Sequence, residues 1–413
     1  MYPAELEAYW LGRARAATGT ADGECALDRV RPAVRRLSDL FTLERPRGAF
    51  PDYATDAVSL AAYGLFFFPQ SFARTALALD QPVRLRGWRP EPAAFPGAPL
   101  RVLDLGSGAG PCGLAALRAV HALAPRRPLE LVAVDHSPGA LALVREVSAR
   151  ALPSSVPVEV ETRAGDLRHA DAVLAGLPPQ DIIVAGFSVN ELFGGTDMPA
   201  LRRWLAALRP LLSANGLLVV LEPALRDTAL SLQGAADALA GAGVFHRWGP
   251  DLGDAPCPLT GGGRAWSHEV RRWTPPASLA YLNRRLFREI GVLKFACTVL
   301  CRTPPEPLPE ARVALRLVSP LQILKGRLAF SAVTVAGELF SVEIPTRGLS
   351  KREIKTSAAA WERGDVVSVD PPALQSVGGG GVPLFRVHSL ESFEVLYLSP
   401  ESSREVSPGN FGD

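Results

Sequence analysis

The chain has 413 residues, of which 47% are hydrophobic and 21% charged, the composition of a globular protein large enough for two or three domains. Its formal net charge is only +2, which excludes a polycation, so any nucleic-acid surface must be a local patch. Five cysteines without a CxxC pair argue against a disulfide framework, and no apolar run approaches the roughly 20 residues that span a bilayer. Because no signal-peptide pattern is present either, we expect a cytoplasmic protein.

Residues 1–95 are predicted to form an N-terminal helical domain. Apolar spacing indicates helices over Ala4–Ala17, Leu27–Leu43 and Ala54–Leu79. Three arginines give the second helix a basic face, which fits a solvated surface, the commoner case, or a contact with RNA: Arg31, Arg35 and Arg36. A stretch with four prolines, residues 90–99, is predicted to be a linker.

A strand, a glycine turn and a helix follow the linker. Val102–Leu105 is a short apolar strand, Leu114–Leu123 has helical spacing, and the turn between them contains Gly106, Gly108 and Gly110. Glycines at such a turn let the backbone pass close to a ligand, and the helix that follows offers free N–H groups. This unit begins a doubly wound α/β sheet of the Rossmann-like kind.

Acidic residues at three successive strand ends indicate which ligand the turn binds. Asp104 lies two residues before the first glycine, Asp135 ends the apolar run Leu129–Val134, and Asp166 follows the strand Val158–Thr162. The first acid would organise the turn around a methionine moiety, the second would accept ribose hydroxyls and the third would meet an adenine. A dinucleotide site would show G-x-G-x-x-G instead. The pattern therefore favours S-adenosylmethionine (SAM) over a dinucleotide or an empty fold.

The same domain, residues 96–303, continues with strands that alternate with helices. We expect strands over Asp181–Phe187, Leu217–Glu222, Val244–Trp248 and Phe295–Cys301, and helices over Ala200–Leu211 and Ser278–Ile290. Ligands of such a sheet lie at the carboxyl ends of its strands. Ser188, Asn190 and Glu191 follow the fourth strand and are therefore predicted to line the acceptor side, with Glu222 at the same edge.

The acceptor side lacks the signatures of two known chemistries. Exocyclic-amine methylation uses an Asn/Asp-Pro-Pro-aromatic run after the fourth strand, and this chain has Ser188, Val189 and Asn190 there. Carbon-5 methylation of cytosine needs a cysteine nucleophile at the fourth or fifth strand end, where none stands. Cys257 lies in the glycine- and proline-rich stretch Gly249–Gly263 of an insertion, residues 249–294, too far downstream for that role. Cys297 and Cys301 are expected to be packed core thiols.

The last part of the chain changes character after a second linker, Pro304–Pro309. Short alternating segments over Arg312–Val318, Gly326–Val335, Glu338–Ile344 and Val366–Val369 predict a small OB-like β-barrel within residues 308–413. The segment Thr346–Lys355 is locally basic. The run Gly378–Gly381 and the tail Ser399–Asp413 are expected to be a flexible loop and terminus.

Taken together, these features resemble the methyltransferase-like family of small-ribosomal-subunit assembly factors of mitochondria and bacteria. The motifs that carry the resemblance span nearly the whole chain: Leu37–Arg45, Ala61–Pro69, Val102–Pro111, Ser350–Arg352 and Arg363–Asp365. The resemblance implies binding of SAM and action on ribosomal RNA or on the assembling small subunit.

One departure from that family concerns an iron–sulfur cluster. Members of the family hold the cluster through three cysteines in the insertion and one in the barrel. Here only Cys257 matches, Ser267 stands where the third cysteine is expected, and residues 329–335 contain none. One thiolate cannot replace four ligands, so we expect no cluster. A zinc site from Cys257, His246 and His268 would lack the usual close spacing, and we predict no metal. Packing through Trp248 and Trp266 is expected to hold the insertion instead.

Three hypotheses on function follow. The first is a SAM-dependent methyltransferase that acts on ribosomal RNA or the assembling small subunit. The second is a non-catalytic RNA-binding assembly factor, which fits the weak acceptor signature. The third is a small-molecule SAM-dependent methyltransferase, which the near-neutral charge allows and the two extra domains disfavour. The oligomeric state is left open by the sequence.

Overall fold

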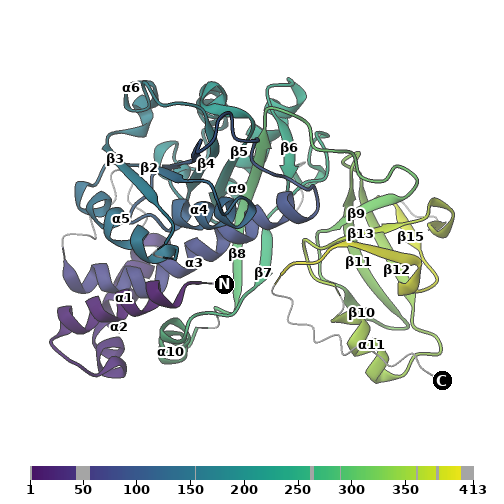
Figure 1. Ribbon diagram of the computed structural model, residues 1–413. Coiled ribbons are helices and arrows are strands. Elements are labelled where there is room, and N and C mark those ends of the chain that lie inside the picture. The colour runs from purple at the N-terminus through teal and green to yellow at the C-terminus, as the bar shows by residue number, and fades with distance from the viewer. Residues whose placement is uncertain are drawn as a thin grey trace.

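The structure, a computed structural model, describes residues 2–42, 56–153, 155–260, 265–288, 290–359, 361–377 and 381–400. Three N-terminal helices pack on a first, mixed sheet with helices on both faces, and a second sheet forms a separate lobe at the C-terminal end (Figure 1). The predicted α/β class with helical N-terminal and β-rich C-terminal regions is confirmed. Most of the predicted glycine run and tail, and the end of the Leu37–Arg45 motif, lie outside the described residues.

The N-terminal helices are α1 (Ala4–Thr18), α2 (Gly23–Thr42) and α3 (Ala57–Arg84). The side chain of Asp56 caps α3 by accepting the N–H groups of Val58 and Ser59. Trp10 of α1 is fully buried against Gly64 of α3, where an added Cβ would lie 2.0 Å from the indole ring. The glycine in the Ala61–Pro69 motif therefore has a packing role, because it lets the two helices approach closely.

The first sheet contains eight strands: β1 (Leu100–Leu105), β2 (Leu129–Asp135), β3 (Val158–Ala164), β4 (Gln180–Gly186), β5 (Leu212–Glu222), β6 (His246–Gly249), β7 (Glu269–Arg272) and β8 (Val292–Cys301). Their order is β3-β2-β1-β4-β5-β8-β6, and β7 pairs with β8. Strands β1 to β5 are parallel, while β8 runs antiparallel to β5 and β6. The doubly wound sheet is as predicted, with the chain reversing its winding direction at β1.

Helices cover both faces of this sheet: α4 (Pro111–Leu123), α5 (Pro138–Ala151), α6 (Ala170–Val173), α7 (Val189–Leu192), α8 (Met198–Ala207), α9 (Arg226–Gly241) and α10 (Ala277–Leu286). One core layer joins α1, α2 and α3 with α4 and α5, and the other joins α8 and α9 to the opposite face. Apolar side chains alternate between the two layers along β1, as a strand buried on both faces requires.

Several sequence-based element boundaries are wrong, and one strand was missed. Phe187 lies outside β4 because its φ of +63° ends the extended backbone. Helix α10 stops at Leu286 instead of Ile290, because Phe287 takes a left-handed conformation that caps the helix. The insertion contains a strand, β7, that the sequence analysis did not predict. Cys297 and Cys301 are buried in the core, as expected.

The second sheet contains β9 (Val313–Leu317), β10 (Gln322–Leu324), β11 (Arg327–Thr334), β12 (Leu339–Pro345), β13 (Val366–Val369), β14 (Gln375–Val377), β15 (Leu384–Arg386) and β16 (Phe393–Tyr397). Its order is β14-β15-β12-β11-β9-β13-β16, and within the described ranges β14 and β16 do not pair to close it. Part of the locally basic segment forms a helix, α11 (Lys351–Ala358), which a capping box of Ser350 and Glu353 begins.

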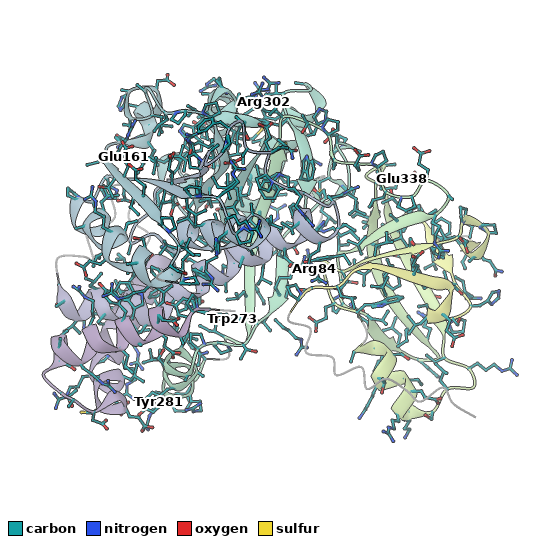
Figure 2. All side chains as sticks on the ribbon, in the orientation of Figure 1. Arg84, Glu161, Trp273, Tyr281, Arg302 and Glu338 are labelled. Carbon is teal, nitrogen blue, oxygen red and sulfur yellow. The ribbon has the colours of Figure 1, made fainter. Side chains whose placement is uncertain are left out.

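The two lobes meet at the C-terminal end of α3. The hydroxyl of Tyr397 donates to Asp80 at 2.8 Å, and the guanidinium of Arg84 lies 5.5 Å from the Tyr397 ring centroid. Figure 2 shows Arg84 in this position between the lobes. Gln81 donates to the carbonyl of Pro250 at 2.9 Å, so α3 also contacts the insertion. No helix in the described part of the chain is long and apolar enough to cross a membrane.

Candidate functional site: a glycine turn with acidic strand ends

The glycines of the turn between β1 and α4 have the backbone conformation that favours glycine. Gly106, Gly108 and Gly110 all have positive φ, from +51° to +90°. An added Cβ on Gly106 would lie 2.3 Å from Cβ of Ser188, so this position also needs glycine for space. The turn is held by N–H groups of Gly106 and Ser107 that donate to the carbonyl of Val134 in β2 at 2.8 and 3.0 Å.

Asp104 lies beneath the turn and is 1% exposed. Its Oδ2 accepts the N–H of Gly113 in α4 at 2.7 Å, while its Oδ1 is buried without a hydrogen-bond partner. Burial raises the pKa of Asp104 to about 7, and the nearby charge of Asp135 adds to this, although the bond from Gly113 lowers it. A buried acceptor without a donor is costly, so a donor brought to this oxygen would stabilise the folded protein.

Asp135 and Asp166 lie at the ends of the next two strands. Oδ2 of Asp135 accepts the N–H of Gly108 at 2.8 Å, and its Oδ1 accepts the N–H of Ser137 at 2.9 Å. Its carboxylate is thus part of the glycine turn as well as the predicted ribose acceptor. Asp166 caps a short 3₁₀ helix and pairs with Arg168 at 2.9 Å, and these bonds lower its pKa. The N–H of Gly165 donates to the carbonyl of Asp135, so all three acids lie along one sheet edge.

The predicted acceptor residues lie at the start of α7. The hydroxyl of Ser188 donates to the carbonyl of Leu105 at 2.9 Å, which ties the end of β4 to the glycine turn. Glu222, at the end of β5, accepts the N–H groups of Val189 and Asn190 at 2.9 and 3.2 Å. The amide oxygen of Asn190 is buried without a partner, whereas Glu191 is exposed. Ser188 and Glu222 therefore shape this edge through contacts within the protein.

One residue at this edge was missed by the sequence analysis. Arg74 of α3 places its guanidinium carbon 5.3 Å from the ring centroid of Phe187, directly after β4. The sequence does carry a signal for it, because Arg74 is the only charged residue between positions 57 and 79 of an otherwise apolar helix. A lone charge in such a stretch indicates either a snorkelling side chain or a built polar site.

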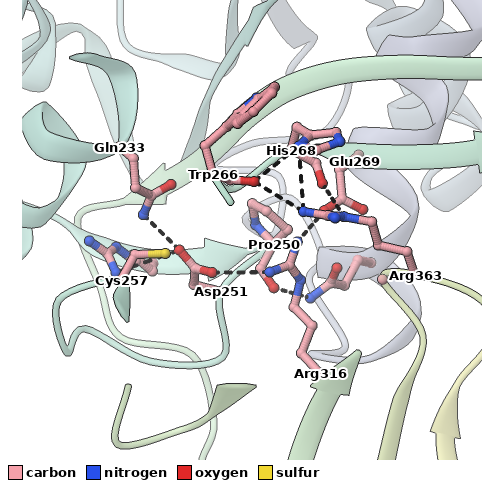
Figure 3. A network of polar contacts seen from close by, with 12 residues as sticks. Gln233, Pro250, Asp251, Cys257, Trp266, His268, Glu269, Arg316 and Arg363 are labelled. Atoms are coloured by element: carbon pink, nitrogen blue, oxygen red, sulfur yellow. Dashed lines mark hydrogen bonds and ion pairs between the residues drawn. The ribbon is translucent and has the colours of Figure 1, made fainter. Parts of the chain in front are cut away.

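The insertion is held by a buried ion network that the sequence analysis also missed (Figure 3). Arg316 of β9 contacts Asp251 at 3.2 Å and forms an ion pair with Glu269 of β7, which pairs in turn with Arg271. Gln233 of α9 donates to Asp251 at 2.7 Å. Because α9, the insertion, β7 and β9 all contribute, this network joins the two lobes.

The Arg363–Asp365 motif takes part in the same junction. Arg363 donates to the carbonyls of His268 and Trp266 at 2.8 and 3.1 Å. Gly364 has a φ of +91°, and an added Cβ would lie 2.3 Å from the guanidinium of Arg271. The sequence shows a glycine between two polar residues, which is a signal for a special backbone position. It does not show that Arg271 is the residue packed against that glycine.

The two tryptophans expected to hold the insertion each donate to a backbone carbonyl. The indole N–H of Trp248 donates to the carbonyl of Thr303 at 2.8 Å, and that of Trp266 donates to the carbonyl of Ala224 at 3.1 Å. These two bonds tie the rings to neighbouring backbone, and the prediction that Trp248 and Trp266 hold the insertion stays a prediction.

The three residues weighed and disfavoured as zinc ligands, Cys257, His246 and His268, are not grouped into a metal site in the described part of the chain. His246 pairs with Asp254 at 2.6 Å, and the described residues include no group of three or more His, Cys, Asp or Glu side chains that could hold a metal ion. Burial raises the pKa of the Cys257 thiol to about 12, and the charge of Asp251 raises it further. A buried thiol with a raised pKa is a poor nucleophile at neutral pH.

Comparison with known proteins found similar solved structures but assigned the chain to no family. No protein-family model matches the chain, and no curated protein sequence matches it significantly. Solved structures do match. One is an arsenic(III) S-adenosylmethionine methyltransferase from Chlamydomonas reinhardtii, with 18% identity and a TM-score of 0.28. The match covers 59% of this chain and 79% of that chain. Another is fibrillarin from Aeropyrum pernix with natively bound S-adenosyl-L-methionine, with 13% identity, 56% and 76% covered, and a TM-score of 0.29.

A third match is the CMeT domain of the citrinin polyketide synthase, with 15% identity and a TM-score of 0.27. The match covers 52% of this chain and about half, 48%, of that domain. With identities and scores this low, the assignment of the fold rests on the observed strand order and not on these matches.

Proposed function

We propose that this chain is a SAM-binding protein of the methyltransferase fold whose partner is RNA, with ribosomal RNA or the assembling small ribosomal subunit as the target. The observation that carries the proposal is the glycine turn itself. It combines positive φ at three glycines, a helix N-terminus, and Asp104 with one buried oxygen unpaired. Asp135 and Asp166 extend the same edge over the next two strands.

The residues at this edge fit the parts of SAM. Asp104 offers an unpaired acceptor to an ammonium group, and Gly106, Gly108 and Gly110 place no side chains of their own over the turn. The oxygens of Asp135 have lone pairs left after accepting one N–H each, and these suit ribose hydroxyls. Asp166 is exposed enough to meet the adenine.

When bound, the cofactor would supply an electrophilic methyl group. The protein would contribute mainly alignment, because a sulfonium methyl needs little acid–base help from its surroundings. Asn190, with an unpaired amide oxygen, is the acceptor-side residue best placed to orient a substrate donor. Ser188 would keep the end of β4 against the turn, and Glu191 would remain near the opening.

A surface on α2 and α10 supports RNA as the partner. Arg31, Arg284 and Arg285 line a surface cavity of about 560 Å³ together with Tyr281. Phe287 at its rim is 95% exposed and is held in a left-handed conformation. An exposed ring among arginines suits a stacked base with its phosphates. Two acids, Glu24 and Asp28, belong to the same region, and Asp28 lies 3.8 and 3.6 Å from Arg31 and Arg285.

A second candidate is a SAM-binding assembly factor that does not transfer the methyl group. The observation in its favour is that the hydroxyl of Ser188 is already bonded to the carbonyl of Leu105, and Glu222 to the start of α7. Two of the polar groups at the acceptor side thus have structural partners, which leaves fewer for a substrate.

A calorimetric titration with SAM tests the shared part of both candidates. We expect binding by the unchanged protein and none by Gly108→Val, since a branched side chain at φ +51° would distort the turn. Gly97→Val is the matched control, because Gly97 also has positive φ but faces open space outside the site. If SAM does not bind, the site is wrong. Binding of SAM and of small-subunit ribosomal RNA without transfer of labelled methyl favours the second candidate.

A further inference from the structure

One end of the second lobe concentrates positive charge. Residues 322–327 comprise β10 and its turn into β11, and residues 346–355 lead from β12 into α11. These two segments, the basic tip, contain six basic side chains and one acid, a net charge of +5 in a chain whose total is only +2. Three of the four lysines of the chain are among the six: Lys325, Arg327, Arg347, Lys351, Arg352 and Lys355.

The two segments of the basic tip are joined by the fold. The N–H of Thr346 donates to the carbonyl of Gly326 at 3.0 Å, and Arg327 of β11 pairs in register with Pro345 of β12. Strand β10 contacts α11, and Figure 1 shows both at the lower end of the second lobe. Ile354 of α11 packs against the apolar core of this lobe. The charges are therefore held on a folded support.

Most of these charges are free to meet a partner. All six basic side chains belong to exposed residues. Arg327 pairs with Glu343 at 2.7 Å, and the acid of the tip, Glu353, accepts the N–H of Ser350 in the capping box at 2.6 Å. Within the described ranges, the other five basic side chains of the tip form no ion pair. Such a cluster attracts a polyanion at close range although the whole chain is almost neutral.

The composition of the basic tip favours the backbone of an RNA duplex over a single strand. Proteins hold single strands by stacking bases on aromatic rings, and the tip contains no aromatic residue. An RNA duplex is recognised through phosphates and 2′-hydroxyls along its wide, shallow minor groove. Ile323 is 52% and Leu349 41% exposed among the charges, and such side chains can lie against the riboses of that groove.

An anionic membrane is the other surface that a basic cluster would attract. Membrane-binding surfaces add large apolar side chains, commonly Trp, Phe and Leu, that enter the lipid. In the basic tip only three aliphatic side chains are counted among the exposed large hydrophobic residues: Ile323, Leu324 and Leu349. The charge therefore outweighs the apolar area, which favours RNA.

We propose that the basic tip binds the phosphate backbone of a double-stranded segment of RNA, through charge and shape and without reading the base sequence. This proposal rests on the proposed function, since it assigns one contact of the same RNA partner. It differs from the surface on α2 and α10, where the exposed ring of Phe287 suits an unpaired base.

Two triple variants separate the basic tip from the overall charge of the protein. The tip variant combines Lys325→Gln, Lys351→Gln and Arg352→Gln. The control variant removes the same number of charges from exposed arginines elsewhere in the described part of the chain, none of which forms an ion pair there: Arg126→Gln, Arg202→Gln and Arg203→Gln. The probes are a fluorescent RNA duplex of about 16 base pairs and an unstructured single strand of the same length.

Fluorescence anisotropy of the full chain, over salt concentrations of about 50 to 200 mM, gives the affinities. The tip variant is expected to bind the duplex about tenfold more weakly than the control variant does, because each lost phosphate contact weakens binding and removes about 0.9 from the slope of log K against log salt. That slope should therefore become shallower by about 2 to 3 in the tip variant only. Affinity for the single strand should be the same in the two variants.

Equal duplex affinity of the two variants would overturn the proposal, and so would an equal loss of duplex and single strand in the tip variant. Sedimentation with phosphatidylserine vesicles adds a third arm: vesicle binding that the tip variant loses, with duplex binding kept, would assign the tip to a membrane instead. In these cases the proposed function stands. If the unchanged protein binds neither RNA, the RNA partner of the proposed function fails too, while the titration with SAM still decides its cofactor.

Discussion

The backbone N–H of Gly108 donates to Oδ2 of Asp135 at 2.8 Å, so the acid at the end of β2 holds the glycine turn at the end of β1. This bond, with that from Ser137, gives Asp135 a role that does not depend on any ligand. Under the proposed function, loss of SAM binding in a variant of Asp135 would be the sum of two effects, a lost ribose acceptor and a loosened turn.

The first prediction separates these effects. Asp135→Ala leaves two buried N–H groups without an acceptor, which typically costs about 1–3 kcal/mol each and less where water can reach. We expect the free energy of unfolding without ligand to fall by about 2 kcal/mol, as measured by urea denaturation. Asp166→Ala loses the cap of a short 3₁₀ helix and an exposed ion pair with Arg168, so it should cost about 0.5–1 kcal/mol, less than Asp135→Ala. Equal stability of the two variants would contradict the bond to Gly108.

The second prediction concerns pH. Asp104 in the unfolded chain titrates near 3.9, while burial raises its pKa in the folded protein to about 7. Between these values the folded state holds a proton that the unfolded state has released, so stability is greatest at the acidic end and falls as pH rises through the window. The slope approaches about 1.4 kcal/mol per pH unit.

Asp104→Asn should remove this dependence, since asparagine does not titrate. The difference in unfolding free energy between the two proteins, measured by urea denaturation from pH 4.5 to 7.5, should therefore change with pH in favour of the variant. Parallel curves would show that Asp104 is ionised throughout. Excess S-adenosylhomocysteine should flatten the wild-type curve, since an ammonium beside Oδ1 stabilises the carboxylate.

The sequence allowed the glycine turn and its acids to be predicted because their signals are local. Strand periodicity, glycines at fixed spacing and acids at strand ends all lie within short windows, and the structure brings Asp104, Asp135 and Asp166 to one edge. Arg74 could not be assigned in this way. Its neighbours Phe187 and Cys112 lie far away in the sequence, and only the presence of a lone charge was visible.

The ion network was hidden for the same reason. Glu269, Asp251 and Arg316 are ordinary charged residues in their own segments, and nothing local shows that they are buried together. The left-handed cap at Phe287 was missed because glycine or asparagine normally marks such a position. Local patterns therefore predicted elements, while partners across the fold required the structure.

The third prediction tests the network. Burial alone would raise the pKa of Glu269, but the charges of Arg271 and Arg316 outweigh it and bring the pKa to about 2. Glu269→Gln leaves the buried guanidinium of Arg271 without its carboxylate and leaves that of Arg316 with Asp251 alone. Breaking a buried pair in this way costs about 3–5 kcal/mol, and we expect a loss of this size in denaturant unfolding. The stability that Glu269 contributes should be complete above pH 4.5 and disappear as pH falls towards 2.

Glu362→Gln is the matched control, because Glu362 pairs with Arg272 at the surface, where the arginine side chain is 63% exposed. Exposed pairs contribute about 0–1 kcal/mol, so this variant should unfold almost as the unchanged protein does. A loss below about 1 kcal/mol in Glu269→Gln would mean that the network does not hold the two lobes together.

The fourth prediction tests whether Gly106 is required for space, for its backbone conformation, or for both. An alanine there would suffer strain at φ +72° and would place its Cβ 2.3 Å from Cβ of Ser188. We expect Gly106→Ala to destabilise the protein by about 2–3 kcal/mol, of which about 1 kcal/mol is backbone strain. Gly106→Ala with Ser188→Gly removes the collision but not the strain, so it should recover part of the stability that Gly106→Ala loses.

Thermal and denaturant unfolding of the two single variants and the double variant give the coupling between positions 106 and 188. A favourable coupling of 1 kcal/mol or more is expected for groups in direct contact. Ser188→Gly alone loses the bond to Leu105 and should cost about 1 kcal/mol. If the unfolding free energies lost by the two single variants simply add, the side chain of Ser188 is not in tight contact with the glycine turn. The end of β4 would then be free to move away from the turn, and Ser188 could serve the acceptor side instead of the structure.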